Sequence, residues 1–202
     1  VVVTSQMQSG ATKLATPDLE TPQSVSIITR EQFEEQGATS VRQAVSYTPG
    51  VYSNQIGASN RFDYIVLRGF SDGSLDNVYL DGLKMMGDTN SHSSLVVDPW
   101  FLEDIEVVRG PASVLYGRSS PGGIVALTSR KPSFDAGGEV KLFAGNNNQR
   151  GAAFDVTGAL DDNDRVAARL SGMTRYADSQ FGPLKEERYA LMPSLTWRIT
   201  DQ

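Results

Sequence analysis

The sequence contains no cysteine and only one histidine, His92. The absence of cysteine excludes a disulfide framework and any thiolate metal site. No apolar run approaches the roughly 18 residues that a transmembrane helix needs. The 18 basic side chains are outnumbered by 24 acidic ones, which gives a net charge of −6. Nucleic-acid phosphates and anionic lipid headgroups bind clusters of basic residues, and the sequence has no basic run. A nucleic-acid partner is therefore not expected.

Catalytic and metal-binding patterns are also missing. His92 has no serine or cysteine nucleophile in a recognisable motif, and Ser119 and Ser120 do not fit the G-x-S-x-G pattern of hydrolases. The acidic run 161–164 lacks the glycine and the distal glutamate of an EF-hand loop, so it predicts a solvated turn. We expect no catalytic residues, no metal ligands and no cofactor, and therefore a protein that is not an enzyme.

The stretch 103–132 carries the clearest local pattern. It predicts a strand over 105–109, followed by a short helix with Pro111 in its first turn, where the missing N–H is not needed. Gly117 ends that helix, and after a glycine-rich turn a second strand covers 124–129.

A phosphate-binding loop is the alternative interpretation of this turn. The Walker A pattern requires G-x-x-x-x-G-K-[ST] and a long helix after it. Here Ala112 replaces the first glycine, Arg118 replaces the lysine, and a strand follows. A structural turn is the better interpretation.

Two capping boxes organise the first part of the chain. Thr29 with Gln32 predicts a helix over 30–36, and Ser40 with Gln43 predicts a second helix over 41–47. Short helices between strands indicate a compact α+β domain. Strands are also expected at 22–29, 64–68 and 77–80, a tight turn at Asp81-Gly82, and a helical turn at Pro99 capped by Asp98.

After Pro132 the pattern changes to strict alternation. Four strands are predicted, with a polar turn over 146–150 and a longer loop over 177–188 before the last strand, and their ranges are 139–144, 154–160, 165–176 and 189–200. In the last strand Tyr189, Leu191 and Trp197 lie on one face. This period is typical of a membrane β-barrel, but a soluble antiparallel sheet has the same period.

Four segments together resemble one family. They occur in its order and spacing, and they are TPQSVSIIT at 21–29, SYTPGV at 46–51, LRGF at 67–70 and RGPASVLYGRSSPGG at 109–123. The chain resembles the plug region of TonB-dependent outer-membrane receptors, specifically the ferric-hydroxamate siderophore receptors of the ferrichrome and ferrioxamine type.

The resemblance implies an α+β plug domain followed by antiparallel strands of a transmembrane β-barrel. The expected domains are a flexible segment at 1–16, a plug at 17–132 and the first four barrel strands at 138–202. Plugged transporters close with about 22 strands, so an N-terminal fragment of a longer receptor is expected. The implied function is import of a ferric hydroxamate siderophore, with energy from the TonB protein, across the outer membrane of a Gram-negative bacterium and in contact with its lipid.

The resemblance also implies site residues. The ferric ion arrives wrapped in hydroxamate oxygens, so upward-pointing plug loops would contact the chelate without binding the metal. The residues expected there are Asp72, Gly73, Ser74, Asp88, Asn90 and His92. Ferrichrome receptors have glycine-glutamine where this chain has Gly73-Ser74, and a linear cationic hydroxamate suits Asp72 and Asp88 better.

Two other sets of residues follow from the family. Arg68, Arg109 and Arg118 are expected to attach the plug to glutamates of the barrel wall. The segment Val1, Val2, Val3 and Thr4 is expected to pair with TonB as an added strand. The alternatives are a receptor for a catecholate siderophore or cobalamin, a mainly signalling surface receptor, and a soluble binding protein.

Overall fold

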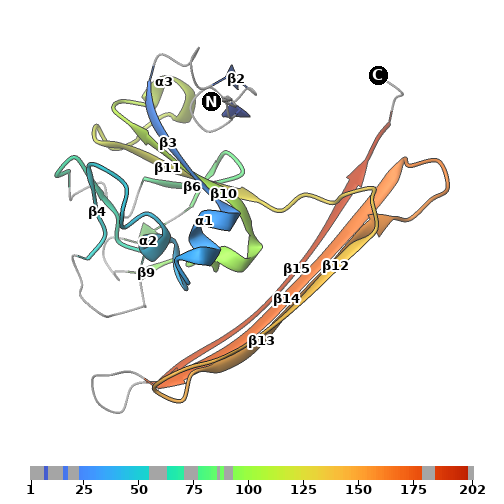
Figure 1. Ribbon diagram of the computed structural model, residues 1–202. Coiled ribbons are helices and arrows are strands. Elements are labelled where there is room, and N and C mark those ends of the chain that lie inside the picture. The colour runs from blue at the N-terminus through green and yellow to red at the C-terminus, as the bar shows by residue number, and fades with distance from the viewer. Residues whose placement is uncertain are drawn as a thin grey trace, which may run out of the picture. The chain divides into compact units, whose positions relative to one another are not determined.

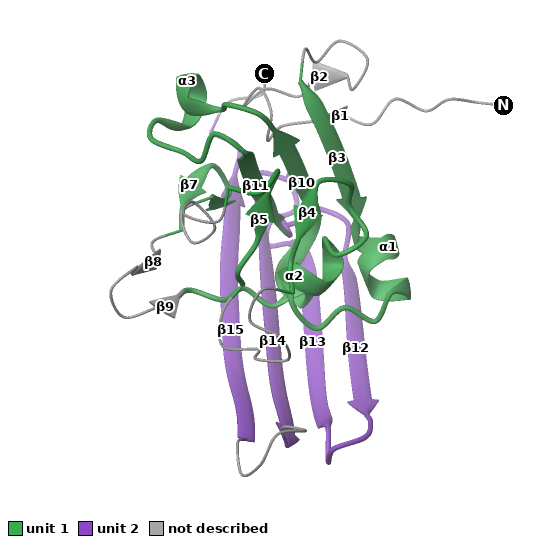
Figure 2. Cartoon of the chain, turned by 90° about the vertical axis from the view of Figure 1, so that its left-hand side faces the viewer, with its two compact units in different colours: residues 1–129 green, residues 130–202 purple. Residues whose placement is uncertain are grey.

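The computed structural model describes residues 23–54, 63–70, 77–85, 93–178 and 185–199. Of four two-residue strands only the backbone is described, and these are β1 (Met7–Gln8), β2 (Thr16–Pro17), β8 (Gly87–Asp88) and β9 (Ser93–Ser94). The chain divides into two compact units, 1–129 and 130–202 (Figure 2). Each unit is built on its own sheet (Figure 1).

Unit 1 contains a five-stranded sheet in the order β3-β10-β11-β6-β7. Its neighbours run antiparallel except β11 and β6, which are parallel. The strands are β3 (Ser24–Thr29), β10 (Leu102–Arg109), β11 (Gly123–Ser129), β6 (Val78–Leu80) and β7 (Leu83–Lys84). The strands predicted from sequence at 22–29, 105–109, 124–129 and 77–80 are thus present, with small shifts at their ends.

Two capped helices follow β3. In α1 (Arg30–Glu35) the Thr29 hydroxyl accepts from the Gln32 N–H, and the Gln32 side chain accepts from the Thr29 N–H, so the predicted capping box is confirmed. Ser40 caps α2 (Val41–Ala44) by accepting from the Gln43 N–H. The prediction that this helix reaches residue 47 is wrong. It ends at Ala44 because turns that lead into Pro49 take over the backbone bonding.

Both faces of this sheet are buried. One face packs against the two helices in a core that includes Phe33, Val45 and Ile105, each at most 1% exposed. The other face carries a smaller cluster with Tyr79 and Ile124 at its centre. Because consecutive strand residues point to opposite faces, β11 reads as a nearly continuous apolar run, whereas β10 also carries the buried Glu106.

Several shorter elements agree with the sequence patterns. Asp81 and Gly82 adopt φ values of 49° and 80° in the turn between β6 and β7. The Asp98 carboxylate accepts from the Trp100 N–H and caps the 3-10 helix η2 (Pro99–Phe101). The strand predicted over 64–68 is shorter, because only Val66–Leu67 (β5) pairs with Val51–Tyr52 (β4).

The short helix after β10 begins later than predicted. It is α3 (Ser113–Tyr116), with Ala112 at its N-cap, so Pro111 precedes the helix and does not occupy its first turn. Gly117 ends it at a φ of 69°, which favours glycine. The strand β11 follows, as the structural-turn interpretation requires.

Unit 2 is one four-stranded antiparallel sheet in chain order (Figure 2). The predicted loop over 177–188 is too long, because Ala177 pairs with Glu186 and Asp178 pairs with Lys185. The pairing extends both adjoining strands toward each other. The strands are β12 (Gly137–Ala144), β13 (Arg150–Ala159), β14 (Val166–Asp178) and β15 (Lys185–Trp197).

One face of the unit 2 sheet is apolar and exposed. Leu191 and Trp197 are 65% and 64% exposed, and the other large apolar residues of that face are exposed as well. Aromatic rings cover two glycines on neighbouring strands. The Phe154 ring lies over Gly172, where an added Cβ would be 2.4 Å from it, and Phe143 lies equally close over Gly151.

Candidate functional site

The loops expected to contact a ligand lie around 53–61, 71–75 and 88–94, and each has one end close to a buried residue. Asp63, at one end of the first loop, accepts from the Arg42 N–H at 3.4 Å and is buried. Asn77, at the end of the second, is fully buried, and its side-chain amide donates to the Ile65 carbonyl at 2.7 Å. Met85, before the third, is buried and bonds by its N–H to Val78. The positions where each loop leaves the core are therefore fixed.

The predicted ligand residues themselves lie outside the described residues. This holds for Asp72, Gly73, Ser74, Asn90 and His92, whereas for Asp88 only the backbone in β8 is described. The TonB segment Val1, Val2, Val3 and Thr4 also lies outside them. These assignments stay predictions.

Of the three arginines expected to attach the plug to the barrel wall, Arg68 and Arg109 lie side by side. A Cβ at Gly50 would be 3.8 Å from the side chain of Arg109 and 3.9 Å from that of Arg68, and a Cβ at Gly110 would be 3.7 Å from Arg68 Nη1. Gly50 and Gly110 both have positive φ. The side chains of Arg68 and Arg109 therefore lie close together near the ends of β5 and β10.

Arg109 is held by oxygen acceptors. Its Nε donates to the Pro49 carbonyl at 2.7 Å, and its two Nη atoms donate to the hydroxyls of Ser24 and Ser26 at 3.1 and 2.6 Å. Partial burial, and then the charge of Arg68, lower the pKa of Arg109. Within the described part of the chain no carboxylate forms an ion pair with either arginine.

Arg118 is not part of this pair. It is exposed, and its backbone carbonyl accepts from Lys84 Nζ at 3.4 Å. The structure therefore brings Arg68 and Arg109 together and leaves Arg118 elsewhere on unit 1.

A second group of polar residues lies within the smaller cluster of unit 1. The rings of Tyr79 and Tyr116 meet edge to face with centroids 4.6 Å apart. Glu106, on β10, is 2% exposed on the same face of the sheet. Burial, the charge of Glu106 and the neighbouring Tyr79 raise the pKa of Tyr116 to about 12. The group ties α3 to the sheet.

Sequence reasoning missed a cluster of charges in unit 2. Asp155 is buried on β13, where it accepts from Arg169 Nε with both oxygens at 3.1 Å. The available signal was the alternation itself, because Asp155 and Arg169 both occupy the polar positions of their strands.

Among the described residues no group of three or more His, Asp or Glu side chains could hold a metal ion. No helix within those residues is long and apolar enough to cross a membrane. In the acidic turn 161–164, which was predicted to be a solvated turn, Asp161 accepts from the N–H groups of Arg165 and Val166.

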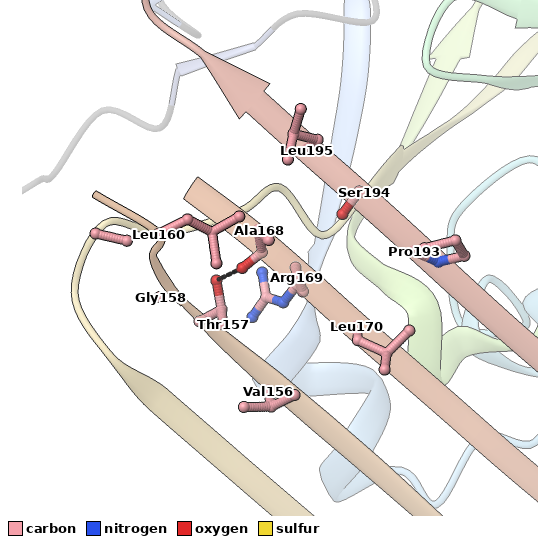
Figure 3. A pocket seen from close by; sticks show the side chains of 11 residues that line it. Val156, Thr157, Gly158, Leu160, Ala168, Arg169, Leu170, Pro193, Ser194 and Leu195 are labelled. Carbon is pink, nitrogen blue, oxygen red and sulfur yellow. Dashed lines mark hydrogen bonds between the residues drawn. The ribbon is translucent and has the colours of Figure 1, made fainter. Parts of the chain in front are cut away.

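A groove of about 580 Å³ lies over three strands of unit 2 (Figure 3). The floor of the groove includes Gly158 and Ala168, which pair directly across β13 and β14. Thr157 donates a hydrogen bond to the Ala168 carbonyl beneath it. Its walls are mostly apolar, and they include Val156, Leu160, Leu170, Pro193 and Leu195. A polar chelate has few donors to bind there.

A family model matches residues 17–124, and it describes the TonB-dependent receptor plug domain. The chain belongs to the TonB-dependent receptor plug family. The match includes both capped helices and four whole strands of the unit 1 sheet, which are β3, β6, β7 and β10. It ends just after the start of β11.

Related receptors match beyond the plug. The chain is 95% identical over its whole length to the ferrioxamine B receptor of Salmonella typhimurium strain LT2, of which it covers 29%. It is 40% identical over 99% of its length to the ferrichrome outer membrane transporter/phage receptor of Escherichia coli K12, covering 27% of it. The chain thus spans less than a third of the length of these relatives.

A solved structure confirms the fold. The open form of the ferric-catecholate import receptor Fiu from E. coli K12 matches 95% of this chain and 27% of its own chain, with a TM-score of 0.79 and 30% identity. The predicted fold class is therefore confirmed: an α+β plug is followed by the first strands of a barrel.

Proposed function

We propose that this chain is part of an outer-membrane receptor that binds a ferric hydroxamate siderophore and imports it with energy from TonB. The observation that carries the proposal is the 95% identity along the whole chain to a receptor named for ferrioxamine B. The 40% identity to a ferrichrome transporter supports the hydroxamate class, since the catecholate receptor Fiu is only 30% identical. The role needs no catalytic group and no resident cofactor.

The exposed apolar face of unit 2 supports the membrane location. In a β-barrel the lipid-facing side chains alternate with the lumen-facing ones. Leu191, Leu195 and Trp197 alternate in this way on β15, and each is at least 64% exposed. We propose that this face contacts the lipid of a Gram-negative outer membrane, that residues 17–132 form the plug, and that residues 138–202 begin the barrel.

Ligand contact is proposed for the plug loops. Their buried stems at Asp63, Asn77 and Met85 hold the loops at fixed points, as a preorganised binding site requires. The contact residues proposed on these loops are Asp72, Gly73, Ser74, Asp88, Asn90 and His92. Residues 1–4 would pair with TonB.

The first experiment titrates the full-length receptor in detergent with ferrioxamine B, ferrichrome, a ferric catecholate and cobalamin, following tryptophan quenching. We expect saturable quenching by a hydroxamate alone. Binding of only the catecholate or cobalamin would overturn the hydroxamate class and leave the plug family intact.

Charge variants sharpen the choice of ligand. Asp72→Asn and Asp88→Asn should each weaken binding of cationic ferrioxamine B by about 5-fold, since an exposed charge pair at 4 Å contributes about 1 kcal/mol. Neutral ferrichrome should be unaffected. Asp162→Asn, in an exposed turn of unit 2, is the matched control, and an equal loss with both ligands would contradict a charge contact.

The arginine pair is proposed to seat the plug in the barrel. Arg68 and Arg109 present two close charges that a barrel carboxylate would neutralise. Arg109→Ala in the full-length receptor should make the plug more sensitive to protease, whereas Arg118→Ala should do so less because Arg118 lies outside the pair. Unchanged protease sensitivity in Arg109→Ala would refute this role.

A further inference from the structure

The first residues of unit 2 are bound to the polar face of its sheet before the first strand begins. Arg130 Nη1 lies 3.3 Å from the Asp155 carboxylate and 3.6 Å from that of Glu139. The carbonyl of the next residue, Lys131, accepts from Arg169 Nη1 at 2.5 Å. One side chain and one backbone group therefore attach the start of this segment to β13 and β14.

Asp155 is the centre of these contacts. Its side chain is 2% exposed, and it accepts from Arg169 Nε and from the hydroxyl of Ser171, which is itself fully buried. A buried carboxylate is stable only when charges and hydrogen bonds compensate it. Here two arginines and one hydroxyl do so, and Arg130 and Arg169 are each only 10% exposed.

The next residues are bound as well. The Ser133 N–H donates to Thr157 Oγ1 at 2.8 Å, and the same hydroxyl lies 3.3 Å from the Ser133 carbonyl. The Phe134 carbonyl accepts from the Ala159 N–H at 3.3 Å. The Arg198 guanidinium stacks 3.8 Å above the Phe134 ring. Backbone groups on three residues of the segment are thus bonded to the sheet.

All of these contacts lie within unit 2. Unit 2 begins at Arg130, so the segment 130–134 precedes the four strands within the same unit. Asp155, Thr157 and Arg169 alternate with the exposed apolar residues Val156 and Leu170, and they therefore face the opposite side from the lipid face.

We propose that residues 130–134 form an anchor that keeps the chain bound to the barrel wall while the plug changes conformation. The carboxylate of Asp155 holds this anchor through its ion pairs with Arg130 and Arg169. The proposal rests on the proposed uptake function, in which the energy-coupling partner acts on the N-terminal segment. Tension applied there passes along the plug and reaches the anchor last. The anchor therefore limits how much of the chain this tension can pull away from the barrel.

The shape of the network suits this task. A segment joined by one contact would separate when that contact broke. Here ion pairs at Arg130, a charge-assisted bond at Lys131 and the bond from the Ser133 N–H to Thr157 Oγ1 hold successive residues to the same two neighbouring strands, so a force that breaks one contact meets the next.

The test is force spectroscopy on the full-length receptor held in a lipid bilayer. A handle is attached to a cysteine introduced by Ser5→Cys, and the chain is pulled from the periplasmic side. In the unmodified anchor, extension should stop when residues 5–129 are extended, at about 440 Å for about 3.5 Å per residue. The measurement needs neither siderophore nor TonB, so its outcome is independent of whether the uptake function holds.

Asp155→Asn removes the charge at the centre and keeps the shape of the side chain. The extension should then continue through residues 130–136, which add about 25 Å, and the final force peak should fall. Thr157→Val removes the Ser133 contacts and should lower the same peak even if Asp155→Asn does not assemble. Asp162→Asn, an exposed carboxylate in the same unit, should leave both the length and the force unchanged.

Three results would overturn the anchor. The first is extension past residue 130 at low force without any substitution. The second is a final force peak that neither Asp155→Asn nor Thr157→Val lowers. The third is a stop that falls well before residue 129, which would place the resisting element within the plug.

Discussion

In the five-stranded sheet of unit 1 the apolar side chains lie inside, and Ile105 and Val107 are fully buried. In the four-stranded sheet of unit 2 the apolar side chains Leu191 and Leu195 are more than 60% exposed, while Asp155 is buried. Consecutive side chains point to opposite faces in both sheets. Unit 1 has buried apolar clusters on both faces of its sheet, whereas unit 2 has an exposed apolar face and a polar face with buried charges.

The largest expected effect comes from removing the buried carboxylate on the polar face of the unit 2 sheet. Asp155→Ala leaves Arg130 and Arg169 with buried charges and should lower the free energy of unfolding of the receptor by about 3–5 kcal/mol. Chemical denaturation in detergent measures it. Asp162→Ala, exposed on a turn, is the control, and equal losses in the two variants would show that burial of the carboxylate is unimportant.

The corresponding change in unit 1 is apolar. Ile105→Ala removes a fully buried side chain from the core next to α1 and should cost about 2–5 kcal/mol. Protease sensitivity of the plug and denaturation report it. Leu195→Ala, on the exposed face, is the matched control and should cost far less. A similar cost at both sites would remove the distinction between the two sheets.

A charged substitution tests whether the exposed apolar face of unit 2 contacts lipid. Leu191 lies at the middle of β15, and Leu191→Arg should destabilise the receptor in bilayers by about 2–4 kcal/mol if that face contacts lipid. Leu191→Phe keeps the face apolar and should be tolerated. Should the arginine variant insert and fold as well as the phenylalanine variant, the face does not contact hydrocarbon.

A smaller effect concerns local structure in unit 1. Thr29→Ala removes the capping hydroxyl of α1 and should cost about 1 kcal/mol. Thr29→Ser keeps an acceptor and should recover most of the loss. Unit 2 has no described helix, so its strands should keep their hydrogen-exchange protection in both variants.

The smallest effect appears only at alkaline pH. Because the pKa of Tyr116 is raised to about 12, from about 10 in an unfolded chain, the folded state holds this proton more tightly. The stability it contributes is complete below pH 10 and is lost as the pH rises from 10 to 12. Tyr116→Phe should flatten the decline of unfolding free energy over that interval. An unchanged slope would place Tyr116 outside the buried cluster.

Local signals in the sequence located most of the elements. The capping box at Thr29, the Ser40 cap, the Asp81-Gly82 turn and the alternation after Pro132 all correspond to described structure. Half of the predicted box at Ser40 is wrong, because the Gln43 side chain accepts from the Thr39 N–H and not from the Ser40 N–H. Their information is contained within a few residues, so no knowledge of the rest of the chain is needed. The end of α2 was misjudged because a cap defines where a helix begins and leaves its length open.

Long-range arrangement was beyond those signals. The parallel pairing of β11 with β6 joins residues 47 positions apart, and nothing in either strand specifies the partner. The closeness of Arg68 to Arg109 likewise depends on how two glycine turns meet. Asp155 was recognised only as a polar position, since its partners lie on the segment 130–134 and on the next strand.

The two aromatic rings that cover glycines in unit 2 have a consequence for assembly. Backbone hydrogen bonds form equally well when two strands slide past each other, so they do not select one alignment. Phe154 fits over Gly172, and Phe143 fits over Gly151, because neither glycine has a side chain in the way. Sliding by two residues would bring Phe154 against Leu170 or Thr174. Each ring therefore recognises one position on the adjacent strand, and a newly formed hairpin can be checked for correct alignment before the next strand is added.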